Sequence, residues 1–419
     1  MSETLHPRYQ EIIDLAEKLW EKKSSLSSQQ LLELMSASFV APIRLLKEAK
    51  GEQEADKETP MRCAYNLLRF GDTAEDRVGL SFEERQLALR KFEYVIGEVA
   101  RLNGSKEFDK GIEDIIKGAE LQTAVQLLQE NNPKIKEKIF VAHFGSGPVL
   151  RELYGLNKEI RKSLEYVIGN MSCGMIEFLE RKEIQTVKQL DDYCYRIAGS
   201  VGEFSNRLVR HVDGRELDEN EAITLGIVLQ YVNILKNAHE DHQEGRSYLP
   251  AAFRPSDVGH HYMMEGEGTA PQNAREIVFG KMLGLFKEKF PNAVHYIQAI
   301  PSHLSGYKAF CLLPTLLAYE TIKTMCNAGA ERVFHKGEES AIKIPYGLES
   351  TLVPFVSTMV KFNQEKSLNN WLIQYSGSPS AFSFEPSVYA QWSPSFLGVN
   401  THPNVSSYEH SQYHNLVKS

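Results

Sequence analysis

Cysteine and long apolar runs are scarce in this chain of 419 residues. Its 5 cysteines are an odd number without CxxC spacing, which argues against a disulfide framework and a structural zinc site. No stretch approaches the roughly 20 apolar residues that a membrane-spanning helix needs. The first residues lack a basic segment followed by an apolar run, so we expect no signal peptide. These absences predict a cytoplasmic protein without a transmembrane segment.

Positive charge is also in deficit, since 47 Lys and Arg stand against 55 Asp and Glu and leave a formal net charge of -8. This balance argues against a general nucleic-acid binder, and we expect no nucleic-acid partner. The chain is 42% hydrophobic and 24% charged, which is typical of soluble globular proteins. A chain of this length can bury a large core.

Strand patterns are almost missing, and helical periodicity dominates up to about residue 375. Only Ile342–Tyr346 could form a short extended piece, and Pro345 argues against a central strand. We expect loops at Lys50–Thr59, which lacks periodicity, and at Pro255–Asn273, which is rich in Gly and Pro. The pattern predicts an all-α protein. Apolar residues recur every three or four positions in residues 9–20, 30–46, 61–70, 160–179, 222–235 and 309–325.

The last part of the chain has a different composition, rich in Ser, Pro and aromatic residues, which cannot form a long helix. Its aromatic residues favour packing onto the rest of the protein, and a disordered tail is the alternative. We therefore divide the chain into a helical domain, residues 1–375, and an irregular C-terminal tail, residues 376–419.

Two aspartates one helical turn apart, Asp72 and Asp76, follow an apolar stretch. On a helix they share a face with Tyr65 and Arg69, and like charges at this spacing repel each other. A cation between the carboxylates would make the pair favourable, and Mg²⁺ commonly bridges a carboxylate to a substrate phosphate. The alternative is a solvated acidic face on which Arg69 forms a surface ion pair.

A second polar stripe occupies residues 230–244, and its amide and carboxylate oxygens suit Mg²⁺. Gly245 is typical of a helix end, and Arg246 just beyond it could reach an anionic ligand. If this stripe faced the first acidic pair across a bundle, the two could clamp a diphosphate through Mg²⁺. A solvated polar face is again the alternative. The stripe consists of Gln230, Asn233, Asn237, Asp241 and Glu244.

Small residues interrupt two apolar helical segments, at Gly174 and from Ala198 to Gly202. Each glycine costs about 1 kcal/mol of helix propensity relative to alanine. Either a long apolar substrate passes the backbone there, or two helices pack closely. Tyr193 and Tyr195 lie between these segments, and their ring faces could stabilise a carbocation.

Taken together, these segments resemble the squalene/phytoene synthase family, the head-to-head trans-prenyl diphosphate synthases. The resemblance covers roughly residues 31–360. Its specific part is the combination of Tyr193-Cys194-Tyr195 with Gly245-Arg246. It implies a single isoprenoid-synthase-type helical bundle around a central apolar channel. The matching blocks are Ser36–Val40, Leu68–Asp76, Gly174–Leu179 with Asp192–Gly202, Leu229–Arg246 and Phe310–Pro314.

The resemblance implies an Mg²⁺-dependent prenyltransferase that joins two prenyl diphosphates through a cyclopropyl diphosphate. Squalene synthases then reduce this product with NADPH, whereas phytoene synthases use no reductant. The chain looks more like a squalene synthase, so we expect two farnesyl diphosphates to give presqualene diphosphate and then squalene. A phytoene- or dehydrosqualene-synthase-type reaction, or another acceptor, is the alternative. We also expect a monomer that contacts membranes peripherally to deliver an oily product.

Position in these blocks assigns the site residues. Asp72 and Asp76 match the first Mg²⁺ motif, and Asp241 matches the last acid of the second motif. Asn237, at the start of the second motif, completes the expected metal ligands. Tyr193 matches the tyrosine that assists diphosphate ionisation and proton handling, so it joins Asp72 and Asp76 as a catalytic residue. Substrate contacts fall on Ser36, Phe39, Tyr65, Arg69, Gln230, Asn233, Lys236, Arg246 and Phe310.

Three positions depart from the family pattern. The second motif normally opens with Arg-Asp, where this chain has Lys236 and Asn237, and Ala37 stands where a diphosphate-binding Arg is expected. These losses raise an alternative of another class, a non-catalytic homologue that binds an isoprenoid or a protein. The intact pair of Asp72 and Asp76 argues against it, because a decayed site has no reason to keep repelling charges.

Overall fold

The computed structural model describes residues 7–21, 24–36, 39–48, 56–77, 79–102, 109–130, 132, 134–334 and 356. The chain divides into two units, Met1–Gly377 and Ser378–Ser419, and every described residue lies in the first. Helices make up the regular structure of these residues, which contain no strand, and the prediction of an all-α protein is confirmed. Ala37, the predicted extended piece Ile342–Tyr346 and the predicted tail lie outside the described residues.

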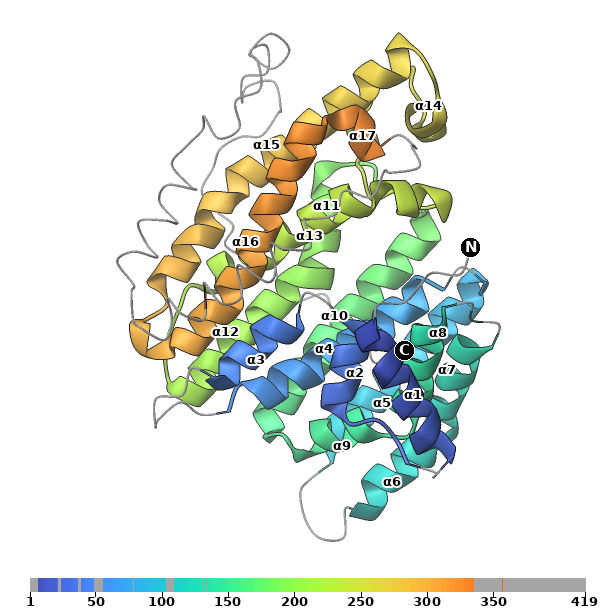
Figure 1. Ribbon diagram of the computed structural model, residues 1–419, viewed down its shortest axis with the longest axis vertical. Coiled ribbons are helices and arrows are strands. Elements are labelled where there is room, and N and C mark those ends of the chain that lie inside the picture. The colour runs from blue at the N-terminus through green and yellow to red at the C-terminus, as the bar shows by residue number, and fades with distance from the viewer. Residues whose placement is uncertain are drawn as a thin grey trace, which may run out of the picture. The chain divides into compact units, whose positions relative to one another are not determined.

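The helices fall into two groups along the chain (Figure 1). The first group comprises α1 (Pro7–Glu21), α2 (Ser28–Met35), α3 (Val40–Glu48), α4 (Glu58–Glu75), α5 (Phe82–Arg101), α6 (Asp109–Lys117), α7 (Ala119–Gln129), α8 (Ile135–Gly145) and α9 (Pro148–Gly155). The second comprises α10 (Lys158–Arg181), α11 (Val187–Cys194), α12 (Ser200–Asp213), α13 (Glu219–Gln243), α14 (His260–Glu265), α15 (Thr269–Ala299), α16 (Ser305–Ala328) and α17 (Ala330–Phe334). A π-helical turn, Tyr195–Gly199, joins α11 to α12.

Side-chain capping fixes where several of these helices begin. At α2, α5 and α11 the N-cap hydroxyl accepts the backbone N–H of the third helical residue, whose own side chain accepts the N-cap N–H. These capping boxes satisfy two backbone donors that the helix leaves unpaired. They matter for function because α5 and α11 carry side chains near the candidate site. The N-cap residues are Ser27, Ser81 and Thr186.

Five of the six predicted helical segments lie within single helices, but the helix predicted at residues 30–46 is wrong in extent. Ser36 ends α2 in an extended conformation, and its Oγ accepts the backbone N–H of Phe39 at 2.8 Å. Such a local bond competes with the helical hydrogen bonds, so α3 starts afresh. The loop predicted at Pro255–Asn273 is also partly wrong, since it contains α14 and the first turn of α15.

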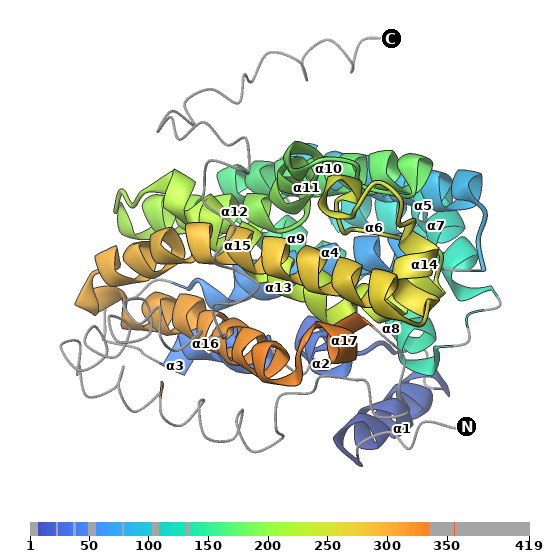
Figure 2. The same ribbon diagram turned by 90° about the horizontal axis from the view of Figure 1, so that it is seen from above.

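The interior of the bundle is organised around α13 and α10. Helix α13 packs against α12, α15 and α16, and Figure 2 shows these helices from above. Helix α10 contacts α4 and α5 as well as α12, so it links the two groups. None of the described helices combines the length and the apolar composition that crossing a bilayer requires.

Two glycines permit a backbone-to-backbone contact in the second group. A Cβ on Gly202 would lie 2.1 Å from the carbonyl oxygen of Ala222, and one on Gly226 would lie 2.2 Å from that of Ala198. Any side chain at either position would force α12 or the π-helical turn away from α13. For Gly202, therefore, the structure supports close helix packing, the second of the two interpretations of the small residues.

Candidate active site

The first acidic motif lies at the carboxyl end of α4. Asp72 belongs to the last turn, whereas Asp76 is the C-cap, and its backbone N–H donates to the Asp72 carbonyl at 2.8 Å. Burial raises the pKa of the Asp72 carboxyl to about 6; Arg69 opposes this shift, while Asp76 and Glu137 add to it. The Asp72 side chain is still 36% exposed, so solvent moderates the effect. The neighbouring Asp76 thus adds to the cost of ionising Asp72.

Arg69 connects this motif to α8. Its Nη1 lies 3.7 Å from Asp72 Oδ2, and its Nη2 donates to Glu137 Oε1 at 3.3 Å. Glu137 is nearly buried, with 7% of its side chain exposed. Arg69 therefore lies between carboxylates of two helices, which differs from the surface ion pair that the alternative predicted. Its Nε–H has no hydrogen-bond partner among the described residues.

The second acidic motif meets the first through Arg246. Helix α13 ends at Gln243, and Gly245 adopts the left-handed conformation, φ 74°, expected of a helix end. The chain then turns back, and the guanidinium of Arg246 donates to Asp76 Oδ1 at 2.7 Å and to Asp241 Oδ1 at 3.3 Å. It also pairs with Glu244. The structure thus brings Asp76 and Asp241 together around one cation.

Asp241 is the most buried acid of the second motif, with 12% of its side chain exposed. Burial raises its pKa to about 7; Arg246 opposes the shift, and Asp76 and Glu244 add to it. Burial therefore disfavours the ionised form of the Asp241 carboxyl group. A divalent cation would favour its ionised form, because it would compensate the buried negative charge.

The remaining predicted polar residues of α13 lie on the side of the helix that solvent reaches in this part of the structure. Asn233 and Lys236 are exposed, and Gln230 and Asn237 are half-buried. The residues between them are buried: Tyr231, Val232, Ile234 and Leu235. The stripe thus leads along α13 to Asp241, as the sequence predicts. Whether these side chains contact substrate stays a prediction.

Tyr193 reaches the acidic motif through a residue that the sequence did not single out. It lies in the last turn of α11, is 7% exposed, and its hydroxyl donates to Glu75 Oε1 at 3.2 Å. Tyr248 donates to the same oxygen at 3.0 Å. Burial raises the pKa of Glu75 to about 8, helped by Asp76 and opposed by Arg246. The predicted catalytic tyrosine is therefore one hydrogen bond away from the residue between Asp72 and Asp76.

Four residues near this cluster were not predicted from the sequence: Glu75, Arg85, Glu137 and Tyr248. A signal for Glu75 was present, since it continues the buried stripe of Leu67 and Gly71 at a spacing of four. An acid on an apolar stripe indicates a buried carboxyl group. Arg85 on α5 donates to the Glu75 carbonyl at 3.0 Å and thereby closes the end of α4. No local pattern marks Arg85, Glu137 or Tyr248.

The aromatic residues predicted to line the substrate lie on α4, α16 and the turn before α3. The rings of Phe39 and Tyr65 lie 5.7 Å apart, and the buried hydroxyl of Ser36 orients Phe39 by accepting its backbone N–H. Phe310 is half-buried on α16, where its ring stacks at 6.1 Å from that of Tyr307. The structure thus pairs Phe39 with Tyr65 and places Phe310 on a separate helix.

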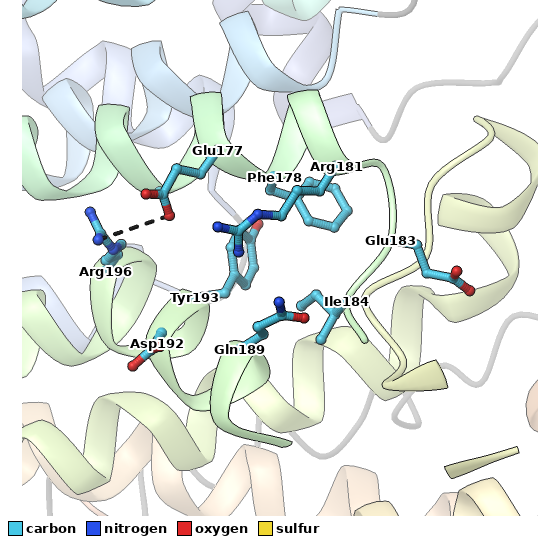
Figure 3. Close-up of a pocket in the computed structure, with 10 residues that line it drawn as sticks. Glu177, Phe178, Arg181, Glu183, Ile184, Gln189, Asp192, Tyr193 and Arg196 are labelled. Atoms are coloured by element: carbon cyan, nitrogen blue, oxygen red, sulfur yellow. Dashed lines mark ion pairs between the residues drawn. The ribbon is translucent and has the colours of Figure 1, made fainter. Parts of the chain in front are cut away.

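Tyr193 also lines a cavity of about 210 Å³ between α10 and α11 (Figure 3). Glu177 and Arg196 pair across its rim at 3.9 Å, and Arg181 extends toward Tyr193 in the same view. Tyr193 is the one predicted site residue among the side chains that line this cavity in the described structure. The cavity and the acidic cluster are therefore neighbouring features that share one tyrosine.

The predicted metal ligands are oxygen donors suited to Mg²⁺, but their side chains do not converge on one coordination site. Within the part of the chain that the structure describes, no three His, Cys, Asp or Glu side chains form a group able to hold a metal ion. Asp72, Asp76, Asp241 and the amide of Asn237 are oxygen donors of the kind that Mg²⁺ prefers. Arg246 lies between two of these acids, so a cation that bridged them would have to displace its guanidinium.

Comparison with known proteins identifies the family. Residues 52–343 match the family model Squalene/phytoene synthase. The chain is 26% identical over 339 residues to squalene synthase of Rattus norvegicus, covering 78% of this chain and 68% of that protein. It is also 26% identical over 353 residues to squalene synthase of Homo sapiens, with 80% and 72% covered.

A solved ligand complex of TcSQS shares the fold, with a TM-score of 0.60 and 18% identity over 85% of this chain and 97% of that chain. The predicted resemblance and fold class are thus confirmed. The chain belongs to the squalene/phytoene synthase family, whose members are prenyltransferases that act on prenyl diphosphates.

Proposed function

We propose that this protein is an Mg²⁺-dependent head-to-head prenyltransferase that condenses two farnesyl diphosphates to presqualene diphosphate. The observation that carries the proposal is the meeting of both acidic motifs at Arg246, next to the hydrogen bond from Tyr193 to Glu75. This arrangement combines oxygen donors for a cation, guanidinium groups for an anion and an aromatic ring for a carbocation. Two relatives named squalene synthase support the choice of substrate.

The carboxylates Asp72, Asp76 and Asp241, with the neutral oxygen of Asn237, would hold Mg²⁺, which stabilises the diphosphate as it leaves. Arg69 and Arg246 flank these acids. The Nε–H groups of both are buried and have no hydrogen-bond partner in the described structure. Since these Nε–H groups are buried, an incoming anion would meet the terminal Nη groups, and charge-assisted bonds to phosphate oxygens are strong.

Tyr193 acts on the organic part of the substrate. The carbon–oxygen bond of the first diphosphate breaks, the electron pair leaves with the diphosphate, and an allyl cation forms. The second prenyl chain then attacks this cation, and the cyclopropane ring closes as a proton passes to the released diphosphate. The Tyr193 ring stabilises the positive charge through its π face. Because its hydroxyl donates to Glu75, the oxygen presents lone pairs rather than a proton to the cation.

Reduction to squalene with NADPH is the second half of the proposal and rests on the relatives. The cavity beside Tyr193, at about 210 Å³, lies below the range of about 300–1,000 Å³ that is usual for small-molecule sites. It does not fit a whole dinucleotide. The groups assigned above thus account for the first half-reaction, and a phytoene- or dehydrosqualene-type outcome without NADPH is the competing product assignment.

The test is incubation of the purified protein with farnesyl diphosphate and Mg²⁺, with and without NADPH, followed by mass spectrometry of the organic extract. Squalene that forms only with NADPH supports the complete proposal. The cyclopropyl diphosphate under both conditions limits the protein to the first half-reaction. If neither farnesyl nor geranylgeranyl diphosphate is consumed, the proposal fails and the non-catalytic homologue, motivated by Asn237, takes its place.

A further inference from the structure

We infer that Tyr248 is a positioning residue for Tyr193, acting through the carboxyl group of Glu75 that both tyrosines share. The inference rests on the proposed function, because that proposal gives Tyr193 its role at the carbocation. It adds a residue that family position does not assign and explains how a side chain on α11 is held against the end of α4.

The shared acceptor fixes the direction of the Tyr193 hydroxyl. Tyr193 and Tyr248 donate to the same Oε1 atom of Glu75, at 3.2 and 3.0 Å. All three side chains are buried, with Glu75 4% and each tyrosine 7% exposed. Turning a buried hydroxyl away from its acceptor leaves polar groups unpaired, which costs more than the net value of the bond. The two donors therefore hold the Oε1 atom of Glu75, and this atom in turn holds Tyr193.

Ring packing supplies a second, separate constraint. The rings of Phe178 and Tyr248 stack with centroids 4.0 Å apart, and the Tyr193 ring lies 4.9 Å from Tyr248 and 5.3 Å from Phe178. Figure 3 shows Phe178 beside Tyr193 at the wall of the cavity. Tyr248 thus fixes the ring of Tyr193 by contact and its hydroxyl through Glu75. A change to phenylalanine removes only the second of these effects.

The short segment that contains Tyr248 also contacts the acidic residues at the end of α4. Arg246 and Tyr248 are two residues apart and reach neighbouring residues at the end of α4, since Arg246 donates to the C-cap Asp76 and Tyr248 to Glu75. The guanidinium of Arg246 also lies over the Tyr248 ring, 5.9 Å from its centroid. The turn after α13 therefore positions Arg246, which joins the two acidic motifs. Through Tyr248 and Glu75 it also positions Tyr193.

Tyr248→Phe tests the inference with steady-state kinetics on farnesyl diphosphate and Mg²⁺, followed by release of inorganic diphosphate. We expect kcat to fall about tenfold, the size of effect that loss of one positioning interaction produces, while KM stays within about twofold. KM is spared because Arg69 and Arg246 still bind the diphosphate. The split between kcat and KM is the readout that a merely structural role would not produce.

Tyr296→Phe is the matched control. Tyr296 is a fully buried tyrosine whose hydroxyl donates to Asn206 Oδ1 at 2.9 Å and lies 2.8 Å from the Tyr307 hydroxyl, so it contacts α12 and α16 rather than α4. It should lose a comparable amount of thermal stability and keep its kcat. An equal fall in kcat for both variants would overturn the inference, because general loosening of the fold would then explain it.

Other outcomes also decide the matter. An unchanged kcat in Tyr248→Phe overturns the inference, as does a raised KM with unchanged kcat, which would make Tyr248 a substrate contact. A wild-type protein that releases no diphosphate defeats the proposed function itself. Should Tyr248→Phe not fold, the comparison moves to Glu75: Glu75→Gln keeps an oxygen that accepts both hydroxyls and should turn over faster than Glu75→Leu, which keeps none. Equal activities of these two variants overturn the inference.

Discussion

At the scale of single residues, the candidate site carries charges that the fold does not favour. Asp72, Glu75 and Asp241 all have a pKa raised by burial, so each ionised carboxylate costs folding free energy. Side chains kept for stability alone would not be expected to show this property. Groups with strongly shifted pKa values gather at functional sites, because binding or catalysis uses the charge that folding resists.

Asp72→Ala should therefore separate activity from stability. We expect turnover of farnesyl diphosphate to fall at least 100-fold, in the range reported for loss of essential electrostatic groups. The melting temperature at pH 8 should stay the same or rise, because an unfavourable charge is removed and alanine has the highest helix propensity. Activity assays and calorimetry on the same preparation measure both effects.

Asp213→Ala should show the opposite pattern. Asp213 ends α12 and pairs at 3.0 Å with Lys57, whose side chain is fully buried. Its loss leaves a buried charge without that partner, and we expect about 3 kcal/mol of destabilisation with kcat largely retained. If Asp72→Ala instead behaved like Asp213→Ala, Asp72 would be a structural residue and would leave the proposed mechanism.

At the scale of helices and their ends, Arg246 acts as an internal counter-ion between α4 and α13. It pairs with Asp76 and Asp241, which the proposed function assigns to Mg²⁺, so the guanidinium and the metal would compete for the same carboxylates. We therefore predict that Arg246→Met binds Mg²⁺ more tightly than the wild type, by a few-fold, when no diphosphate is present. The same variant should bind inorganic diphosphate more weakly in the presence of Mg²⁺. Isothermal titration calorimetry measures both affinities.

Arg151→Met is the control for this experiment, because Arg151 on α9 pairs with Glu113 on α6 at 2.7 Å, and neither helix carries a predicted site residue. Its Mg²⁺ and diphosphate affinities should match those of the wild type. Weaker Mg²⁺ binding in Arg246→Met would mean that the guanidinium holds the acids in place for the metal instead of competing with it. Absence of Mg²⁺ binding by every form would count against the metal itself.

The helices and the two acidic motifs were predictable because each depends on local spacing. A period of 3.6 residues places Asp72 near Asp76 and lines up Gln230 to Asp241 without any knowledge of the rest of the chain. The break at Ser36 was not predictable from periodicity, since one side-chain hydrogen bond decides it. Local chemistry of this kind overrides a favourable apolar pattern.

The links between motifs could not be predicted from local spacing. Tyr193 is 118 residues from Glu75 along the chain, and Tyr248 is 173 residues from it. Their contact depends on how α4, α11 and the turn after α13 pack, which no single segment encodes. The resemblance supplied Tyr193 as a candidate, but only the packed structure shows that Glu75 and Tyr248 hold it.

At the scale of the whole molecule, the raised pKa values predict how stability depends on pH. In the unfolded chain these acids ionise near their ordinary values, about 4. In the folded protein Asp72, Asp241 and Glu75 ionise near pH 6, 7 and 8. Between about pH 4 and pH 8 these carboxyl groups therefore bind more protons in the folded state than in the unfolded state. Stability is therefore highest at the acidic end of this window and falls as pH rises through it.

Melting temperatures measured from about pH 5 to pH 8 without divalent cations test this prediction, and we expect a progressive fall. Adding Mg²⁺ should restore stability at pH 8 more than at pH 5, because the cation binds the ionised carboxylates and protons compete with it at low pH. Asp72→Ala should reduce the fall in the lower half of the range, where Asp72 titrates. A melting temperature that rises with pH in all forms would show that other ionisable groups dominate. The acids of the candidate site would then not be the main source of pH-dependent stability in this fold.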